Sequence, residues 1–128
     1  MKKDVREIYH AFNGKLVGTK KMRFAVCEVL SKMPVNIIRK ITRTCWFLSS
    51  MDDAWAFTFT GNDLKSQHLI FLSDDLLQQN RKQIYHSIAH EIGHVILRHR
   101  NSVLERQTKR EIKKQEKEAD FFAREFGF

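Results

Sequence analysis

The sequence predicts an α+β fold, because two helical stretches flank a shorter stretch with strand-like alternation. Apolar residues recur every three or four positions through residues 1–44 and again from about residue 80 onward, the period of helices with one buried face. Between these stretches, residues 55–60 alternate aromatic and small side chains, as in a strand with one buried face. A length of 128 residues suggests one domain, spanning 1–128, around a single core.

Composition limits the class of protein. The chain is 42% hydrophobic and 11% aromatic, which favours a folded globule over disorder. No run approaches the roughly 18 apolar residues of a membrane span, and residues 1–7 lack the apolar region of a signal peptide. Cys27 and Cys45 form no recognisable metal pattern. We therefore expect free thiols in a reducing compartment and a cytoplasmic protein.

The chain is strongly basic, with a formal net charge of +8 and a pI of about 9.7. A basic surface suits nucleic acid or an acidic partner. However, no block of arginine and lysine is interleaved with aromatics, and no nucleic-acid-binding motif is present. Direct nucleic-acid binding is therefore not favoured as the main role.

Three helices are expected in the first part of the chain. The first covers residues 5–12 and stops at Asn13-Gly14. The second runs from about Thr19 to Ser31, and Pro34 then opens a short third helix. The expected core positions of the last two are Met22, Ala25, Val26, Val29, Leu30, Met33, Ile37, Ile38 and Ile41.

Three strands follow, at residues 45–49, 55–60 and 68–72. The turn signals Ser50-Met51-Asp52-Asp53 and Gly61-Asn62-Asp63 separate them. Because these connections are short, the sequence favours an antiparallel meander.

A helix from about residue 80 to residue 97 carries the main chemical signal, His90-Glu91-Ile92-Gly93-His94. His90 and His94 are four residues apart and project from one side, where two neutral imidazoles can hold one Zn²⁺. Glu91 points elsewhere around the helix, near the metal but not bound to it, which suits a general base. The apolar face of this helix contains Ile84, Ile88, Ile92, Val95 and Ile96.

Gly93 is unusual inside this helix, because a glycine there costs roughly 1 kcal/mol against alanine. We therefore expect a neighbouring side chain to pack closely against it.

A catalytic zinc usually takes a third protein ligand. A histidine six residues after His94 is excluded, because Arg100 stands there. His99 is turned about 500° from His94 and is better explained as a helix C-terminal residue favoured by the dipole. On the last helix, Glu116 and Asp120 are four apart and share a side. Glu116 could complete the ligand set, and Asp120 could accept the other ring N–H of a ligand histidine.

The last helix opens at one of two capping boxes, Ser102 with Glu105 or Thr108 with Glu111, and we favour the second. Gly127 ends it. Glu118 points roughly 160–200° away from Glu116 and Asp120, toward solvent. The apolar face of this helix is Ile112, Ala119, Phe122, Ala123 and Phe126.

His90-Glu91-Ile92-Gly93-His94, followed by Glu116-Lys117-Glu118-Ala119-Asp120-Phe121-Phe122-Ala123, resembles the ImmA/IrrE family of zinc metallopeptidases, which are gluzincins. The resemblance covers roughly residues 68–123; the first 65 or so residues resemble no family that we can name. It implies a zincin-like fold with the motif helix and a C-terminal glutamate helix, to which the sequence patterns described above add N-terminal helices and a small antiparallel sheet. It also implies Zn²⁺ held by His90, His94 and Glu116, catalysis by Glu91, and support of a ligand histidine by Asp120.

Members of that family include prophage or mobile-element proteins that promote cleavage of a DNA-bound repressor. The resemblance therefore implies a protein or peptide substrate, with a helix-turn-helix repressor as one example. In zincin-like folds the strand before the motif helix commonly edges the cleft, so we expect an extended substrate to pair with residues 69–72. The residue that stabilises the oxyanion is not identifiable; Tyr85 and His86 are neighbours of the motif only in sequence.

Three hypotheses for function remain at this point. The first is a zinc metallo-endopeptidase, the second a zinc-stabilised module that binds a regulator without cutting it, and the third a basic nucleic-acid-associated protein with a structural metal. Glu91 favours the first over the second, because a structural zinc site has no need of it. Strongly salt-dependent DNA binding would favour the third.

Overall fold

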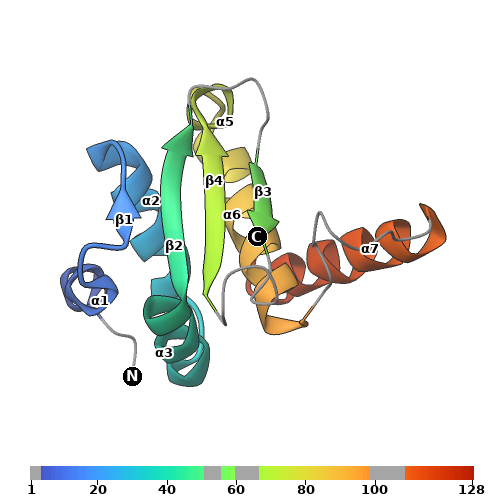
Figure 1. Ribbon diagram of the computed structural model, residues 1–128, viewed down its shortest axis with the longest axis horizontal. Helices are drawn as coiled ribbons and strands as arrows, with labels where there is room; N and C mark the ends of the chain where they lie inside the picture. The colour runs from blue at the N-terminus through green and yellow to red at the C-terminus, as the bar shows by residue number, and fades with distance from the viewer. Residues whose placement is uncertain (1–3, 51–55, 60–66, 99–108) are drawn as a thin grey trace.

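The computed structural model describes residues 4–50, 56–59, 67–98 and 109–128, which form an α+β arrangement. Figure 1 shows α2 and α6 behind a small sheet, with α7 packed against α6 at one end. The described helices are α1 (Val5–Phe12), α2 (Lys20–Ser31), α3 (Val35–Thr44), α5 (Asp74–Leu77), α6 (Arg81–Ile96) and α7 (Lys109–Glu125). The described strands are β1 (Leu16–Val17), β2 (Cys45–Ser50), β3 (Ala56–Phe59) and β4 (His68–Ser73).

Side-chain caps set the helix starts where the sequence predicts them. Thr19 accepts a hydrogen bond from the Met22 backbone N–H at the start of α2, and Asn80 accepts one from the Gln83 N–H at the start of α6. Asn13 ends α1 in the left-handed conformation, with φ of 50°. The predicted helices at residues 5–12, 19–31 and 80–97 are therefore confirmed, while the four-residue helix α5 was not expected.

The prediction of an antiparallel meander is wrong. The strand order is β1-β2-β4-β3, in which β1, β2 and β4 run parallel and only β3 is antiparallel to its neighbour. Strand β4 lies between β2 and β3, with Ile70 opposite Phe47 on one side and Thr58 on the other. The physical reason is that β4 carries a nearly continuous apolar run and no exposed residue, which suits a strand of a parallel sheet that is covered on both faces.

The central place of β4 also removes the predicted substrate position. Both edges of residues 69–72 are hydrogen-bonded to other strands, so no peptide can add alongside them. Within the part of the chain that the structure describes, β3 is the strand beside α6 at the outer edge of the sheet.

The core lies between the sheet and the helices and contains the expected faces of α2, α3 and α6. Cys27 and Cys45 are buried free thiols, and burial raises the pKa of Cys45 to about 12. No helix among residues 4–50, 67–98 and 109–128 is long and apolar enough to cross a membrane.

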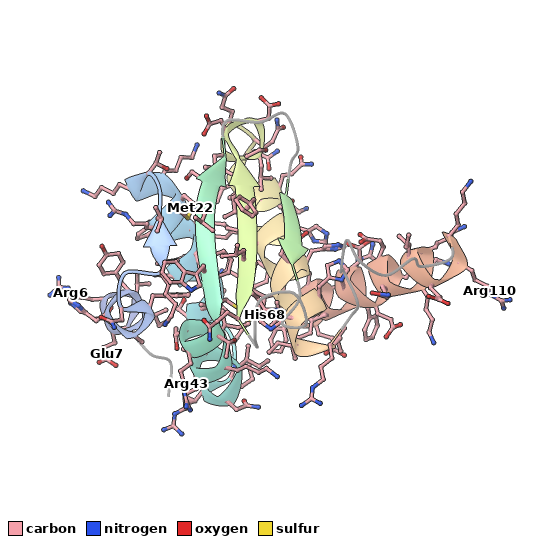
Figure 2. The ribbon with its side chains drawn as sticks, viewed as in Figure 1. Arg6, Glu7, Met22, Arg43, His68 and Arg110 are labelled. Atoms are coloured by element: carbon pink, nitrogen blue, oxygen red, sulfur yellow. The ribbon has the colours of Figure 1, made fainter. Side chains whose placement is uncertain are left out.

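Helix α7 departs from prediction at its first turns. Ile112 is 46% exposed, although it was expected on the apolar face, whereas Ala119, Phe122 and Ala123 are buried. The reason is visible in Figure 2, where the end of α7 that bears Arg110 projects away from the rest of the described structure. The described part of α7 begins at Lys109. Ser102, Glu105 and Thr108, on which the choice between the two capping boxes depends, lie outside the described residues, as do His99 and Arg100.

Candidate metal centre

The candidate site forms where α7 packs across α6, and Gly93 makes this approach possible. A Cβ atom added at Gly93 would lie only 3.0 Å from Cδ1 and 3.2 Å from Cβ of Phe122 on α7. The expectation that a neighbour packs closely against Gly93 is therefore confirmed. Because the helices touch here, residues 90–94 of α6 face residues 116–120 of α7.

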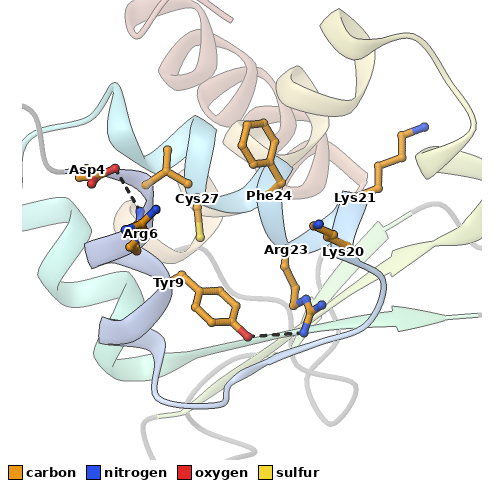
Figure 3. Close-up of a pocket in the computed structure, with 9 residues that line it drawn as sticks. Asp4, Arg6, Tyr9, Lys20, Lys21, Arg23, Phe24 and Cys27 are labelled. Atoms are coloured by element: carbon orange, nitrogen blue, oxygen red, sulfur yellow. Dashed lines mark hydrogen bonds between the residues drawn. The ribbon is translucent and has the colours of Figure 1, made fainter.

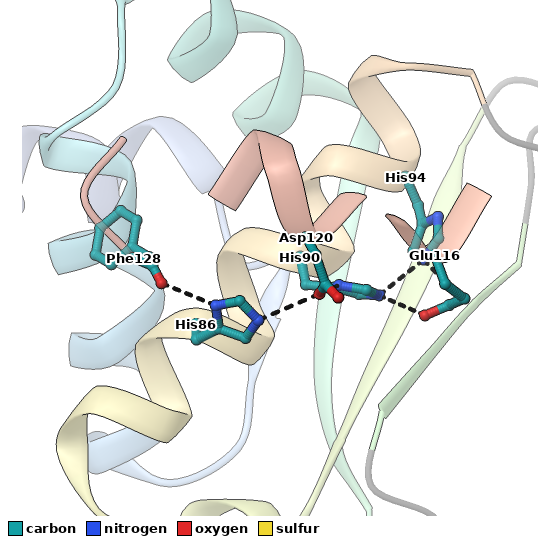
Figure 4. Close-up of polar contacts among 6 residues, drawn as sticks. All are labelled: His86, His90, His94, Glu116, Asp120 and Phe128. Atoms are coloured by element: carbon teal, nitrogen blue, oxygen red, sulfur yellow. Dashed lines mark hydrogen bonds and ion pairs between the residues drawn. The ribbon is translucent and has the colours of Figure 1, made fainter. Parts of the chain in front are cut away.

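Three side chains from the two helices converge at this contact (Figure 4). Nε2 of His90 lies 2.8 Å from Oε2 of Glu116 and 3.1 Å from Nε2 of His94. Nε2 of His94 lies 3.1 Å from Oε1 of Glu116. The rings of His90 and His94 are 14% and 10% exposed, and the Glu116 side chain is 53% exposed. The group is thus anchored in the helix contact and open to solvent on the Glu116 side.

The protonation of His90 explains why this convergence suggests a cation. Nδ1 of His90 donates to Oδ1 of Asp120 over 2.7 Å, so a neutral His90 ring presents a lone pair at Nε2. That lone pair faces the Glu116 carboxylate, and two acceptors at 2.8 Å repel one another unless a cation lies between them. The nearby Nε2 of His94 can donate or accept, depending on its tautomer. The cation is either a proton or a metal ion.

The donor set fits zinc. Two imidazole nitrogens and one carboxylate are a common ligand set of catalytic zinc. Ligands held at about 2.0–2.2 Å in a tetrahedron lie roughly 3.3–3.6 Å from one another, and the separations of 2.8–3.1 Å here are slightly shorter. The ligand atoms of His90, His94 and Glu116 could therefore hold one ion.

Asp120 and His86 form a second layer of contacts around His90. Burial tends to raise the pKa of Asp120, but the hydrogen bonds and charges of His90 and His86 outweigh it and hold the pKa below its usual range. Nδ1 of His86 donates to the Phe128 carbonyl over 2.8 Å, and its Nε2 lies 3.3 Å from Oδ1 of Asp120. This second contact is a hydrogen bond when His86 carries both ring protons.

His86, His90 and Asp120 also form a possible metal-holding group. The short contact between His90 and Asp120 uses the Nδ1 proton, however, so we interpret this group as hydrogen-bonded support for His90.

The structure brings together four of the five predicted site residues in one cluster of close polar contacts: His90, His94, Glu116 and Asp120. Glu91, the fifth, is 7% exposed and follows His90 on α6. Glu118 is exposed and belongs to neither metal-holding group among the described residues.

Sequence reasoning missed His86. The available signal was its position four residues before His90, which places both side chains on one face of the helix.

Comparison with known proteins points in the same direction for this part of the chain. Residues 84–128, which include His90, His94 and all of α7, match the family described as Peptidase U49. No curated protein matches the chain, and no solved structure matches it either. The match supports a peptidase, acting on a protein or peptide, and it does not single out the ImmA/IrrE family.

Proposed function

We propose that this chain is a zinc-dependent metallo-endopeptidase that hydrolyses peptide bonds of a protein substrate. The observation that carries the proposal is the convergence of two histidine nitrogens and one carboxylate, with His90 oriented by Asp120. The Peptidase U49 match over the same two helices supports the reaction class. We also propose that residues 1–128 form a single domain and that this domain has a zincin-like fold.

In this proposal His90, His94 and Glu116 hold the ion. When bound, Zn²⁺ supplies a Lewis acid that polarises the scissile carbonyl and lowers the pKa of water. Asp120 keeps the proton of His90 on Nδ1 and thereby leaves Nε2 free to coordinate.

Glu91 is the group that transfers a proton during hydrolysis. It is adjacent to His90 and turned about 100° from it around the helix, so its carboxylate borders the ion without replacing a ligand. It takes a proton from the attacking water and delivers it to the leaving amine. Only hydrolysis requires such a group, so Glu91 separates an enzyme from a non-catalytic binding module.

The substrate that we propose is a regulatory protein, such as a DNA-bound helix-turn-helix repressor of a prophage or mobile element. This part of the proposal comes from the resemblance of the two motifs to the ImmA/IrrE family. A neighbouring gene for such a repressor would identify the protein to test first.

The decisive test of catalysis is Glu91→Gln. The wild-type protein should cut members of a peptide library made from a cell proteome, and the variant should lose at least about 100-fold in rate, because proton transfer contributes about 10²–10⁴-fold. Mass spectrometry of the library measures the cleavage, and metal analysis should show unchanged zinc in the variant. Cleavage by the variant at the wild-type rate would contradict the assigned role of Glu91. A wild-type protein that holds zinc and cuts nothing would favour the binding module.

A further inference from the structure

A hollow lies between α1 and α2, at the end of the molecule opposite α7 (Figures 1 and 3). Its volume is about 780 Å³ and it is open to solvent. It is lined by Asp4, Val5, Arg6, Tyr9, Lys20, Lys21, Arg23, Phe24 and Cys27. We call it the α1–α2 groove. It contains none of the proposed metal-site residues.

The wall of the α1–α2 groove is largely apolar. Phe24 is 49% exposed and Tyr9 is 42% exposed, while Cys27 is buried beneath them. Two exposed aromatic side chains over one hollow are unusual on the surface of a soluble domain, and such patches commonly mark binding sites. The groove therefore has the shape and surface to receive an apolar side chain.

The rim of the groove is positively charged. Arg6, Lys20, Lys21 and Arg23 line it, and the one carboxylate is Asp4, which caps α1 by accepting from the Arg6 backbone N–H. The guanidinium of Arg23 lies 5.8 Å from the Tyr9 ring centroid and donates to the Tyr9 hydroxyl over 3.4 Å. The remaining cations have complementary chemistry for carboxylates, in a chain whose net charge is +8.

The same combination continues toward α6. A smaller hollow of about 280 Å³ shares Lys21 and Phe24 with the groove and adds Arg81 and Tyr85. The guanidinium of Arg81 lies 5.6 Å from the Tyr85 ring centroid. Phe24 thus stands between two hollows that each combine aromatic and cationic side chains, which suits an extended or helical segment better than a small molecule.

We propose that the α1–α2 groove binds an acidic peptide segment that inserts an apolar side chain beside Phe24. The cations of the rim pair with acidic residues on either side of that anchor. A nucleic acid fits less well, because stacking of successive bases needs several open aromatic faces, and Arg23 covers the Tyr9 ring, which leaves Phe24 as the open ring of the groove lining. The proposal does not depend on peptidase activity.

The probe is a fluorescent peptide in which two leucines are flanked by glutamates, and binding is followed by fluorescence anisotropy. Phe24→Ser and Lys20→Glu should each weaken binding about fivefold or more, because they remove the apolar contact and reverse a rim charge. The controls are Phe121→Ser and Arg39→Glu, which replace an exposed phenylalanine and reverse an exposed positive charge outside the groove. They should leave the peptide affinity within about twofold. Circular dichroism verifies folding of each variant.

Salt and competition complete the test. About 0.5 M salt should weaken the peptide complex without abolishing it, because its apolar contact is not screened. Equal loss in the controls, or no peptide binding by the wild type, would overturn the proposal. If a single-stranded oligonucleotide binds more tightly than the peptide, and Phe24→Ser weakens that binding, the groove would be assigned to nucleic acid instead. A concentration-dependent dimer that Phe24→Ser dissociates would assign it to a second copy of the chain.

Discussion

At the scale of single residues, Asp120 connects His90 of the candidate metal centre with His86, one turn earlier on α6. One of its oxygens lies 2.7 Å from Nδ1 of His90 and 3.3 Å from Nε2 of His86. Helix spacing alone predicts that Glu116 and Asp120 lie near the same histidines, because residues four apart project from one face of a helix. The contact of His86 with Phe128 depends on how α7 ends against α6, and no spacing within α6 contains that information.

Asp120→Asn should weaken zinc binding about 10–100-fold, the usual effect of removing a charged partner of a ligand histidine. The lowered pKa of Asp120 means that its carboxylate is ionised at neutral pH, so the wild-type contact is charge-assisted. Competition with a chromogenic chelator measures the affinity. Glu118→Gln is the matched control, because it removes the same charge from the same helix. Equal affinities of Asp120→Asn and wild type would show that Asp120 does not support His90.

At the scale of elements, the sequence was informative wherever a pattern is local. The starts of α2 and α6 were correct because Thr19 and Asn80 are caps that act within one turn. The predicted antiparallel meander was wrong because alternation indicates which face of a strand is buried but not which strand lies beside it. The apolar run of β4 held a usable signal for a central strand, and β3, whose sequence alternates, lies at the edge.

The contact between α6 and α7 predicts the effect of Gly93→Ala. Alanine favours the helix by roughly 1 kcal/mol, but its Cβ would lie 3.0–3.2 Å from Phe122 and force α7 outward. We expect a net destabilisation of about 1–2 kcal/mol from overpacking, together with weaker zinc binding, because Glu116 moves with α7. Urea unfolding measures the first effect and chelator competition the second. Phe122→Leu, added to Gly93→Ala, should restore part of the stability and part of the zinc affinity. A gain in stability from Gly93→Ala alone would contradict this packing account.

At the scale of the whole molecule, the proposed metal centre would tie α7 to the core. Zinc binds across α6 and α7 in the proposal, and α6 also contacts α2 and β3. The role of the first 65 or so residues could not be assigned from sequence, because their apolar faces predict only a core. The α1–α2 groove becomes visible only when α1 and α2 are placed side by side.

If the chain is one domain, thermal unfolding should show a single transition that zinc shifts upward. Binding to the folded state alone adds about 4 kcal/mol when free zinc is 1,000 times the dissociation constant, which for a chain of this length raises Tm by about 10 °C or more. Calorimetry with zinc and with a chelator measures the shift. His90→Ala/His94→Ala should show the same Tm in both conditions. Two separate transitions, only one of them zinc-sensitive, would contradict the single domain.

The central claim is that His90, His94 and Glu116 hold one zinc ion, and the most direct measurement is the metal content of Glu116→Ala beside Glu118→Ala. Both residues are exposed on α7, two positions apart, so the two substitutions have similar effects on the helix itself. Glu116 lies 2.8 Å from His90 and 3.1 Å from His94, whereas Glu118 is in neither metal-holding group. Wild type and Glu118→Ala should contain one zinc per chain, and Glu116→Ala should lose most of it. Full zinc in Glu116→Ala, or its loss in Glu118→Ala, would contradict the proposed centre.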